Sequence, residues 1–244
     1  MMRKYIWPVA LAAAVVGGAL GCEGKGGADK AASAADTAAR QPPSFSTFTD
    51  TRDGKVYRIV KIGRQNWFAE NLNYASIGSS CYGEDGDVYD GGNEYRLSNA
   101  EVEANCAKYG RLYSWIEAKK VCPSGWHLPK DAEWTKLFKY AGGKSTAGKK
   151  LKSTSGWNNE GNGTDEYGFS TLPGGIASSV FGNAGYYGAW WSTNGAWLAV
   201  HRDITNGIMW RMSFNYDSVD RFKGGYGPTI WCSVRCVADK EAKK

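Results

Sequence analysis

Polar and apolar side chains alternate near the start of the folded region. Between Lys55 and Ile62 the pattern is that of a strand with one buried face, and Gly63 and Arg64 separate it from a second apolar run through Trp67. Two such runs around a short turn are typical of a β-hairpin. The sequence therefore predicts an antiparallel hairpin over residues 55–67.

Helical patterns follow in the middle of the chain. Ser98 with Glu101 three residues later forms a capping box, and Gly110 is a typical residue to end a helix. We expect a helix between these points, with Cys106 in its last turn. A second, short helix is expected in the segment RLYSWIEAKK, residues 111–120.

A further helix is predicted after Pro129. Trp134, Leu137, Phe138 and Ala141 lie at positions i, i+3, i+4 and i+7, the spacing that places side chains on one face of a helix, and two glycines follow. That face is expected to be buried.

After Ser153 the pattern becomes one of glycine, asparagine and aromatic residues, for which we expect short strands and long loops with a hairpin turn at 205–207. The chain holds 32 Gly, 11 Trp and 14 Tyr, which suits such an arrangement better than a helical bundle. Trp190 and Trp191 are adjacent and would point to opposite faces of a strand. We expect at most one of them in the core.

The N-terminus carries the pattern of an export signal. Two cations precede a short apolar run that ends at Ala19-Leu20-Gly21-Cys22, and this end resembles the lipobox of bacterial lipoproteins. We predict a signal peptide over 1–21, lipidation of Cys22, a flexible Ala/Gly/Ser tether over 22–44, a folded domain over 45–239 and a basic tail over 240–244. The protein is then exported and held by its lipid in the cell envelope, with the outer membrane as the expected site.

The charge of the chain argues against one class of partner. The formal net charge is +6, but the basic residues are scattered and form no stripe, so we expect no nucleic-acid partner.

Five cysteines remain beyond Cys22. In an exported chain they favour disulfides over catalysis or metal binding, and an odd number leaves one thiol over. Cys232 and Cys236 are four residues apart, which on a strand is about 13 Å, so they would not pair with each other there. Their partners remain open at this point.

Several blocks of the sequence resemble, in order, the Fibrobacter succinogenes major paralogous domain. They cover nearly all of residues 46–238 and include DGKVYRIVKIGRQNWFAENLNY, CAKYGRLYSWIEA, CPSGWHLPKDAEWTKL, GNGTDEYGFSTLPGG, YGAWWST and SVRCV. That family is similar in turn to the C-type-lectin-like fold of the sulfatase-modifying proteins. The resemblance implies an α+β, C-type-lectin-like domain with two main helices, short antiparallel strands, long Gly- and aromatic-rich loops and disulfide staples, and it brings no established activity.

The resemblance also suggests how the cysteines pair. It implies Cys81 with Cys106 and Cys122 with Cys236, the latter tying the middle of the chain to its end and contributing about 4 kcal/mol in the chain-entropy model. Cys232 stands where an aromatic residue or serine is commoner in the pattern, so it is the expected free thiol. Lys130 replaces the usual Ser or Thr helix cap, a loss of about 1 kcal/mol.

Catalytic sites are weighed against these structural roles. A copper oxidase of the formylglycine-generating kind needs two nearby thiols, which Cys232 and Cys236 would supply only if Cys236 were free. Cys122 and His127 could form a nucleophile and base, but no orienting group is evident. With only two histidines, no multi-histidine zinc site is expected. We expect no enzyme activity and no cofactor.

Two loops offer candidates for ligand binding. Asp85, Asp87 and Asp90 are hard-oxygen candidates for calcium, although their spacing fits no EF-hand and solvated turns are the favoured account. In the later loops the candidates are Trp157, Asn158, Asn162, Asp165, Glu166, Trp191 and Trp197, with Asn162 and Asp165 favoured as partners of loop backbone.

The sequence thus favours a lipid-anchored envelope protein that binds a glycan, a cell-wall polymer or a partner protein without catalysis. The alternatives are a passive surface lipoprotein and, less favoured, the copper oxidase. An exposed set of aromatic residues on the loops would favour binding.

Overall fold

The structure is a computed structural model that describes residues 42–198, 201–223 and 229–239. The predicted signal peptide, Cys22, most of the tether and the basic tail lie outside the described residues. Within them, no helix has the length and apolar character needed to span a membrane.

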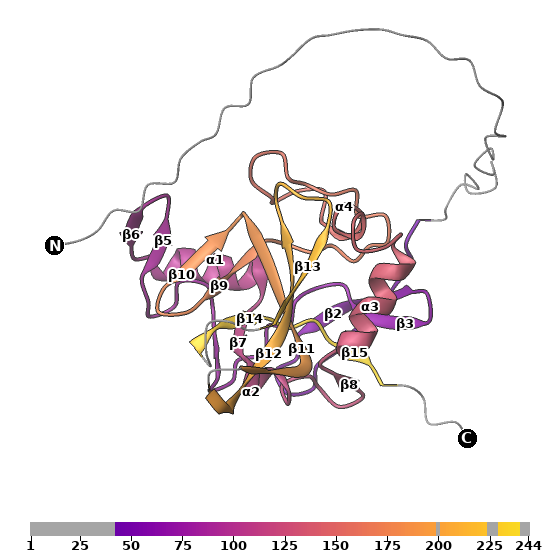
Figure 1. Cartoon of the computed structure of the whole chain (residues 1–244), viewed down its shortest axis with the longest axis horizontal. Coiled ribbons are helices and arrows are strands. Elements are labelled where there is room, and N and C mark those ends of the chain that lie inside the picture. The colour runs from indigo at the N-terminus through magenta and orange to yellow at the C-terminus, as the bar shows by residue number, and fades with distance from the viewer. Residues whose placement is uncertain (1–41, 199–200, 224–228, 240–244) are drawn as a thin grey trace, which may run out of the picture. The chain divides into compact units, whose positions relative to one another are not determined.

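Strands in two sheets make up most of the regular secondary structure of the described chain (Figure 1). The smaller sheet has the order β1 (Phe45–Thr49), β2 (Val56–Ile62), β3 (Gln65–Phe68), β15 (Val237–Ala238) and β8 (Trp126–His127). Both the hairpin predicted over residues 55–67 and the apolar face of its first strand are confirmed.

The larger sheet is built around two long strands. Its order is β13 (Val219–Lys223), β12 (His201–Ser213), β11 (Tyr187–Leu198), β14 (Trp231–Ser233), β9 (Gly174–Ala177), β10 (Phe181–Ala184), β5 (Val88–Asp90) and β6 (Asn93–Tyr95). β7 (Leu112–Ser114) joins β14 to β4 (Ser79–Ser80).

The helices are short and lie outside the sheets: α1 (Asn99–Tyr109), α2 (Trp115–Ala118), α3 (Asp131–Tyr140) and α4 (Ala147–Leu151). α1 begins with the predicted capping box of Ser98 and Glu101. The N-cap residue of α3 is Lys130, whose side chain forms no capping hydrogen bond. The second predicted helix, over 111–120, is reduced to one turn because its first residues form β7.

The expected fold class is wrong. We expected a C-type-lectin-like α+β domain with two main helices, whereas the described residues form fifteen strands and helices of at most 11 residues. The segment after Ser153 has the expected long loop over 154–173, but it also supplies strands of 12 and 13 residues in place of short ones. The turn expected at 205–207 is also wrong, because these residues lie inside β12 and pair with 195–197 of β11.

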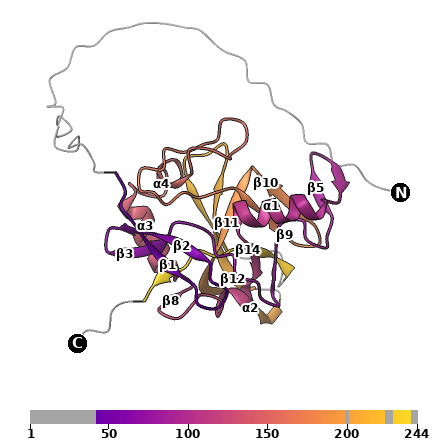
Figure 2. The same ribbon diagram turned by 180° about the vertical axis from the view of Figure 1, so that it is seen from behind.

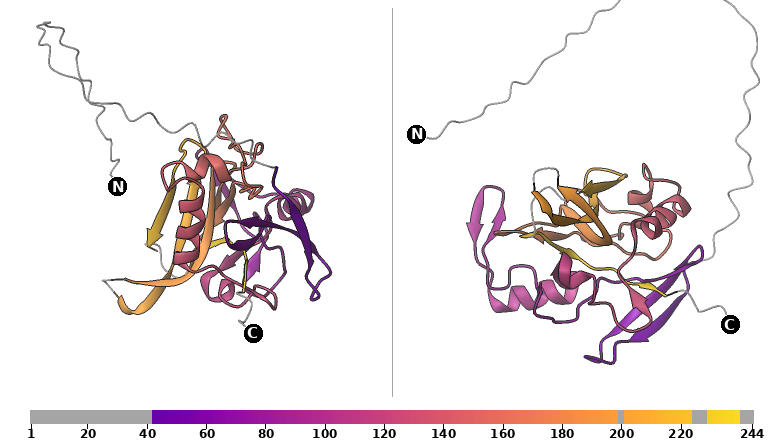
Figure 3. Two further views of the ribbon diagram at one scale, coloured as in Figure 1. Left: turned by 90° about the vertical axis from the view of Figure 1, so that its right-hand side faces the viewer. Right: turned by 60° about the horizontal axis from the view of Figure 1, so that its bottom comes forward.

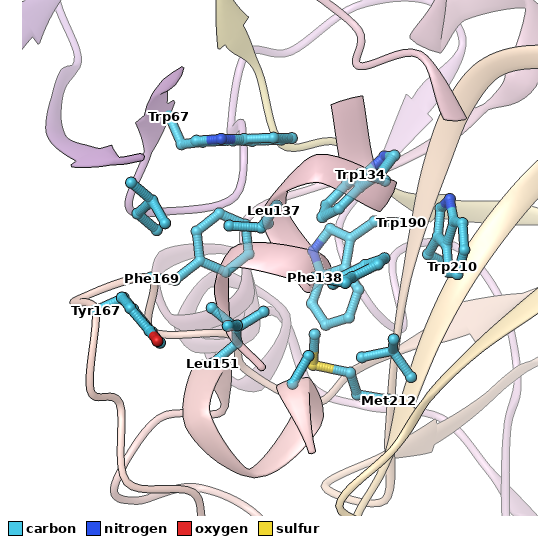
Figure 4. Packing of buried hydrophobic residues seen from close by; sticks show 14 of the residues in the cluster. Trp67, Trp134, Leu137, Phe138, Leu151, Tyr167, Phe169, Trp190, Trp210 and Met212 are labelled. Carbon is cyan, nitrogen blue, oxygen red and sulfur yellow. The ribbon is translucent and has the colours of Figure 1, made fainter. Parts of the chain in front are cut away.

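The core lies between α3 and the long strands (Figure 3, left; Figure 4). The predicted helix face is buried, with Trp134, Leu137 and Ala141 at 0% exposure, and Phe138 packs on Trp210 with ring centroids 4.8 Å apart.

Trp190 and Trp191 are both buried, contrary to our expectation that one would leave the core. β11 has neighbours on both faces, so Trp190 enters the cluster of α3 while Trp191 enters a second cluster with Tyr113 and Cys232. A strand covered on both faces accepts two consecutive large side chains, which alternation alone does not reveal.

Two disulfides, Cys81–Cys106 and Cys122–Cys236, join the cysteines as the family resemblance implied. Among the described residues Cys232 is the free cysteine, and it is fully buried, with its sulfur 3.8 Å from that of Met209.

We predict that the two disulfides differ in their contribution to stability. Their cysteines are 114 and 25 residues apart, so the chain-entropy model gives about 1 kcal/mol more for Cys122–Cys236 than for Cys81–Cys106. Urea unfolding of the two double Cys→Ala variants measures this. A greater loss from removing Cys81–Cys106 would contradict the prediction.

Candidate functional site

A polar pocket of about 550 Å³ is lined by residues of the smaller sheet, the end of α1 and the loops after α4. Figure 2 shows β2, α1 and α4 from behind. We call this pocket the Arg235 pocket. It is lined by Lys55, Val56, Tyr57, Arg58, Ala69, Glu70, Asn71, Asn73, Cys106, Ala107, Lys108, Gly110, Ser153, Thr154, Ser155, Asp165, Ser170, Leu172 and Arg235. Its size is within the range of ordinary small-ligand sites.

Arg235 is the most deeply buried charge of this pocket, with 1% exposure. Its guanidinium donates to the carbonyl oxygens of Phe68 at 3.1 Å and Phe169 at 2.5 Å, and to Oδ1 of Asn71 at 3.0 and 3.2 Å. Among the described residues no carboxylate forms an ion pair with it. Burial lowers the pKa of Arg235 to about 9, so the group still carries its charge at neutral pH.

Asn71 holds the guanidinium in place and is itself buried. Besides Arg235, its Oδ1 accepts a hydrogen bond from the indole of Trp190 at 2.8 Å, while its Nδ2 donates to the carbonyl of Tyr109 at 2.8 Å and to Oγ of Ser233 at 3.3 Å. One amide thus connects α1, both sheets and the floor of the pocket.

Gly110 brings the end of α1 against the pocket. Its φ is 72°, and a Cβ at this position would lie 2.8 Å from the carbonyl oxygen of Leu72. Only glycine combines that backbone angle with so close an approach.

The wall formed by β2 is charged but internally paired. Arg58 and Glu70 form an ion pair at 2.8 Å, and Lys55 donates to the carbonyl of Asn73 while lying 3.2 Å from Asp53. Tyr57 is buried below them, and burial raises its pKa to about 12. The phenol is therefore neutral at physiological pH.

The opposite wall comes from the loops after α4. Asp165 has φ 46°, and its two oxygens accept hydrogen bonds from the backbone N–H of Ser170 at 2.7 Å and from the Ser170 hydroxyl at 2.5 Å. Asn162 accepts from the N–H of Trp157 at 3.0 Å. Both Asx residues thus bond to loop backbone as the sequence favoured, and only Asp165 reaches the pocket.

The tryptophans predicted to bind a ligand do not line this pocket. Trp157 and Trp191 are buried, at 4% and 3% exposure, and their indoles donate to the carbonyls of Thr171 and Tyr113, so neither is available to stack on a sugar. This corrects the prediction for both. The side chain of Trp197 lies outside the described residues.

The other loop candidates are scattered. Asn158 is exposed near Gly185, and Glu166 lies 3.5 Å from Lys150 on the far side of the loop wall. Neither belongs to the pocket.

The calcium candidates are not brought together. Asp87 forms an ion pair with Arg96 at 2.7 Å, and Asp85 and Asp90 are exposed. In the part of the chain that the structure describes, no three His, Cys, Asp or Glu side chains are grouped as a metal site.

The candidate catalytic thiols have structural positions. Cys122 and Cys236 are joined to each other, and burial raises the pKa of the Cys232 thiol far above its ordinary value. Neither a Cys122–His127 pair nor a Cys232–Cys236 copper pair is therefore formed. His127 instead lies between two carboxylates, 2.6 Å from Asp239 and 2.9 Å from Glu133.

Two buried cations were missed by the sequence reasoning. Arg235 is a single charge in the apolar run WCSVRCV, and that isolation is the signal that marks it. Lys152 is also buried and donates to the carbonyls of Ser213 and Tyr216, each at 3.1 Å, and burial lowers its pKa. Lys152 fixes the loop wall to the end of β12.

A family model described as the Fibrobacter succinogenes major domain matches residues 60–238, which is most of the chain. The match includes every residue that lines the pocket from Ala69 onward. Neither a curated protein nor a solved structure matches the chain.

We predict that Arg235→Lys lowers the free energy of unfolding by about 3 kcal/mol. Lysine has fewer donors and no planar fork, so buried carbonyls at Phe68, Phe169 or Asn71 lose their partner at about 1–3 kcal/mol each. Arg58→Lys is the matched control, because its ion pair with Glu70 is exposed and is worth less than about 1 kcal/mol. Equal losses in urea unfolding would refute the role of Arg235.

Proposed function

We propose that this chain, which belongs to the Fibrobacter succinogenes major domain family, is a non-catalytic binding module of the bacterial cell envelope. Its ligand is a glycan or cell-wall polymer, which the Arg235 pocket holds.

The observation that carries this proposal is the composition of the pocket. Its lining combines hydroxyl, amide, carboxylate and cationic groups, including the exposed Thr154 and Ser155 at its rim. A ring bearing several hydroxyls needs such alternating donors and acceptors, whereas an apolar ligand would leave them unpaired.

The positions of the cysteines support binding rather than reaction. The thiol that would act as nucleophile, Cys122, is in a disulfide with Cys236, and Cys232 is enclosed beside Met209. A thiol enzyme needs a free, accessible thiolate as its nucleophile, and the surroundings of these cysteines disfavour one.

The lipid anchor completes the proposal. Cys22 at the end of an export signal takes the lipid, and the Ala/Gly/Ser segment that follows lets the domain reach polymer at some distance from the membrane.

We predict that Thr154→Trp blocks ligand binding. Thr154 is exposed at the rim, so an indole there fills part of the pocket without disturbing the core. Thr135→Trp on the exposed face of α3 is the matched control. On an array of glycans and cell-wall polymers, the wild-type chain and the control should share bound ligands that Thr154→Trp loses.

Three results would contradict this proposal. Ligands that Thr154→Trp still binds would place the binding site elsewhere. If the chain retains nothing on the array but retains a specific envelope protein in a parallel pull-down, the ligand is a protein partner. If it retains neither, the chain is a passive surface lipoprotein.

The anchor is tested separately by Cys22→Ser. In the native host the wild-type chain should enter the detergent phase on cloud-point separation and carry acyl groups on its N-terminal peptide by mass spectrometry. Cys22→Ser should remain in the aqueous phase, and Ser33→Ala in the tether should behave as wild type. Detergent partition of Cys22→Ser would refute lipidation at this residue.

A further inference from the structure

We propose that the Arg235 pocket selects a saccharide unit that carries a carboxylate, as in a uronic-acid or other acidic-sugar polymer. This inference rests on the proposed function and names the class of its ligand.

The lining of the pocket carries more positive than negative groups. The lining holds four cations, Lys55, Arg58, Lys108 and Arg235, against two carboxylates, Glu70 and Asp165. An anionic ligand group would neutralise part of this excess.

Most of these charged groups already have partners within the protein. Arg58 is paired with Glu70 at 2.8 Å, and both oxygens of Asp165 accept hydrogen bonds from Ser170. Lys55 is held by Asp53 at 3.2 Å. Among the described residues this leaves Lys108 and Arg235 as the lining cations without a carboxylate partner.

These two cations occupy different depths. Arg235 lies at the floor, where its guanidinium is bonded to neutral oxygens and lies 4.5 Å from the ring centroid of Phe169, while Glu70 and Asp165 act on its charge without bonding to it. Lys108 is exposed in the last turn of α1, with its Nζ 4.7 Å from the ring centroid of Tyr109. A carboxylate that enters the pocket passes the mobile ammonium at the rim and approaches the fixed positive field at the floor.

The same arrangement disfavours a phosphate. Phosphates and carboxylates both commonly pair with an arginine fork that has free N–H groups, so the difference between them in this pocket lies in their charge. Here the donors of Arg235 are directed at Phe68, Phe169 and Asn71, and the Arg58 fork is occupied by Glu70. Two carboxylates in the walls further oppose a doubly charged group. A singly charged carboxylate attached to a hydroxylated ring fits both the charge and the polar rim.

The test compares acids with their own esters. The full chain, purified in detergent, is applied to an array on which each carboxylated saccharide is paired with its methyl ester, together with neutral and phosphorylated saccharides. We expect the acids to bind at least about tenfold more tightly than their esters, with an affinity that falls as salt is raised.

Lys108→Glu tests the rim cation. It should weaken binding of the acids by about tenfold or more and leave binding of the esters within about twofold. Lys139→Glu is the matched control, because Lys139 is also exposed in the last turn of a helix, α3, but does not line the pocket. Equal thermal shifts in the two variants show that any difference in binding does not come from folding.

The outcomes separate this inference from the proposed function. Equal binding of acids and esters, or a selective preference for phosphorylated members, overturns the carboxylate class while leaving a glycan-binding module. Loss of acid binding in Lys139→Glu as large as in Lys108→Glu overturns the location. An array without any bound saccharide overturns both proposals.

Discussion

The hydrogen-bonded pair of Arg235 and Asn71 is the contact on which the rest of the architecture depends. The guanidinium reaches the carbonyls at the end of β3 and in the loop before β9, and the amide reaches the indole of Trp190 and the last residue of α1. Both groups are buried, so an unmade bond would leave a polar atom without water or partner. The two sheets and α1 can therefore meet in only one relative placement, and the pocket is the space that this placement leaves open.

The end of the chain is secured over this arrangement by a second group of contacts. β15 pairs with both β3 and β8, the disulfide from Cys122 reaches Cys236 one residue before β15, and His127 lies between Asp239 and Glu133. The two ring nitrogens of His127 contact one carboxylate each, which ties the last described residue to the start of α3. The segment VCPSGWHLPKDAEW, with its cysteine and histidine, thus closes the fold, and its density of unusual residues has a structural cause.

The sequence could predict local elements more readily than their assembly. The capping box at Ser98, the hairpin around Gly63 and the apolar stripe that includes Trp134 depend on neighbours close in the chain, and each is found where the pattern placed it. The sheet order, the burial of both Trp190 and Trp191 and the continuation of β12 through 205–207 depend on partners in other strands or on cover from both faces. Periodicity carries no information about such partners. The same limit applies to the site, since Asp165 was a candidate from its own loop, whereas Arg235 and Lys108 become pocket residues only when distant segments meet.

The fate of the tryptophans explains why the candidate site is polar. The indoles of Trp157, Trp190 and Trp191 donate N–H groups to buried carbonyls or to Asn71, so these three side chains fix segments of the fold to one another and are not presented on the loops. The proposed recognition then rests on charges and hydroxyls, which line the pocket around a buried cation that has no carboxylate hydrogen-bonded to it. For the proposed acidic ligand, a carboxylate is expected to gain more from the protein than a neutral ring does, because the positive charge of Arg235 is already in position. The bonds that hold Arg235 in the fold also hold its charge at the lining of the pocket.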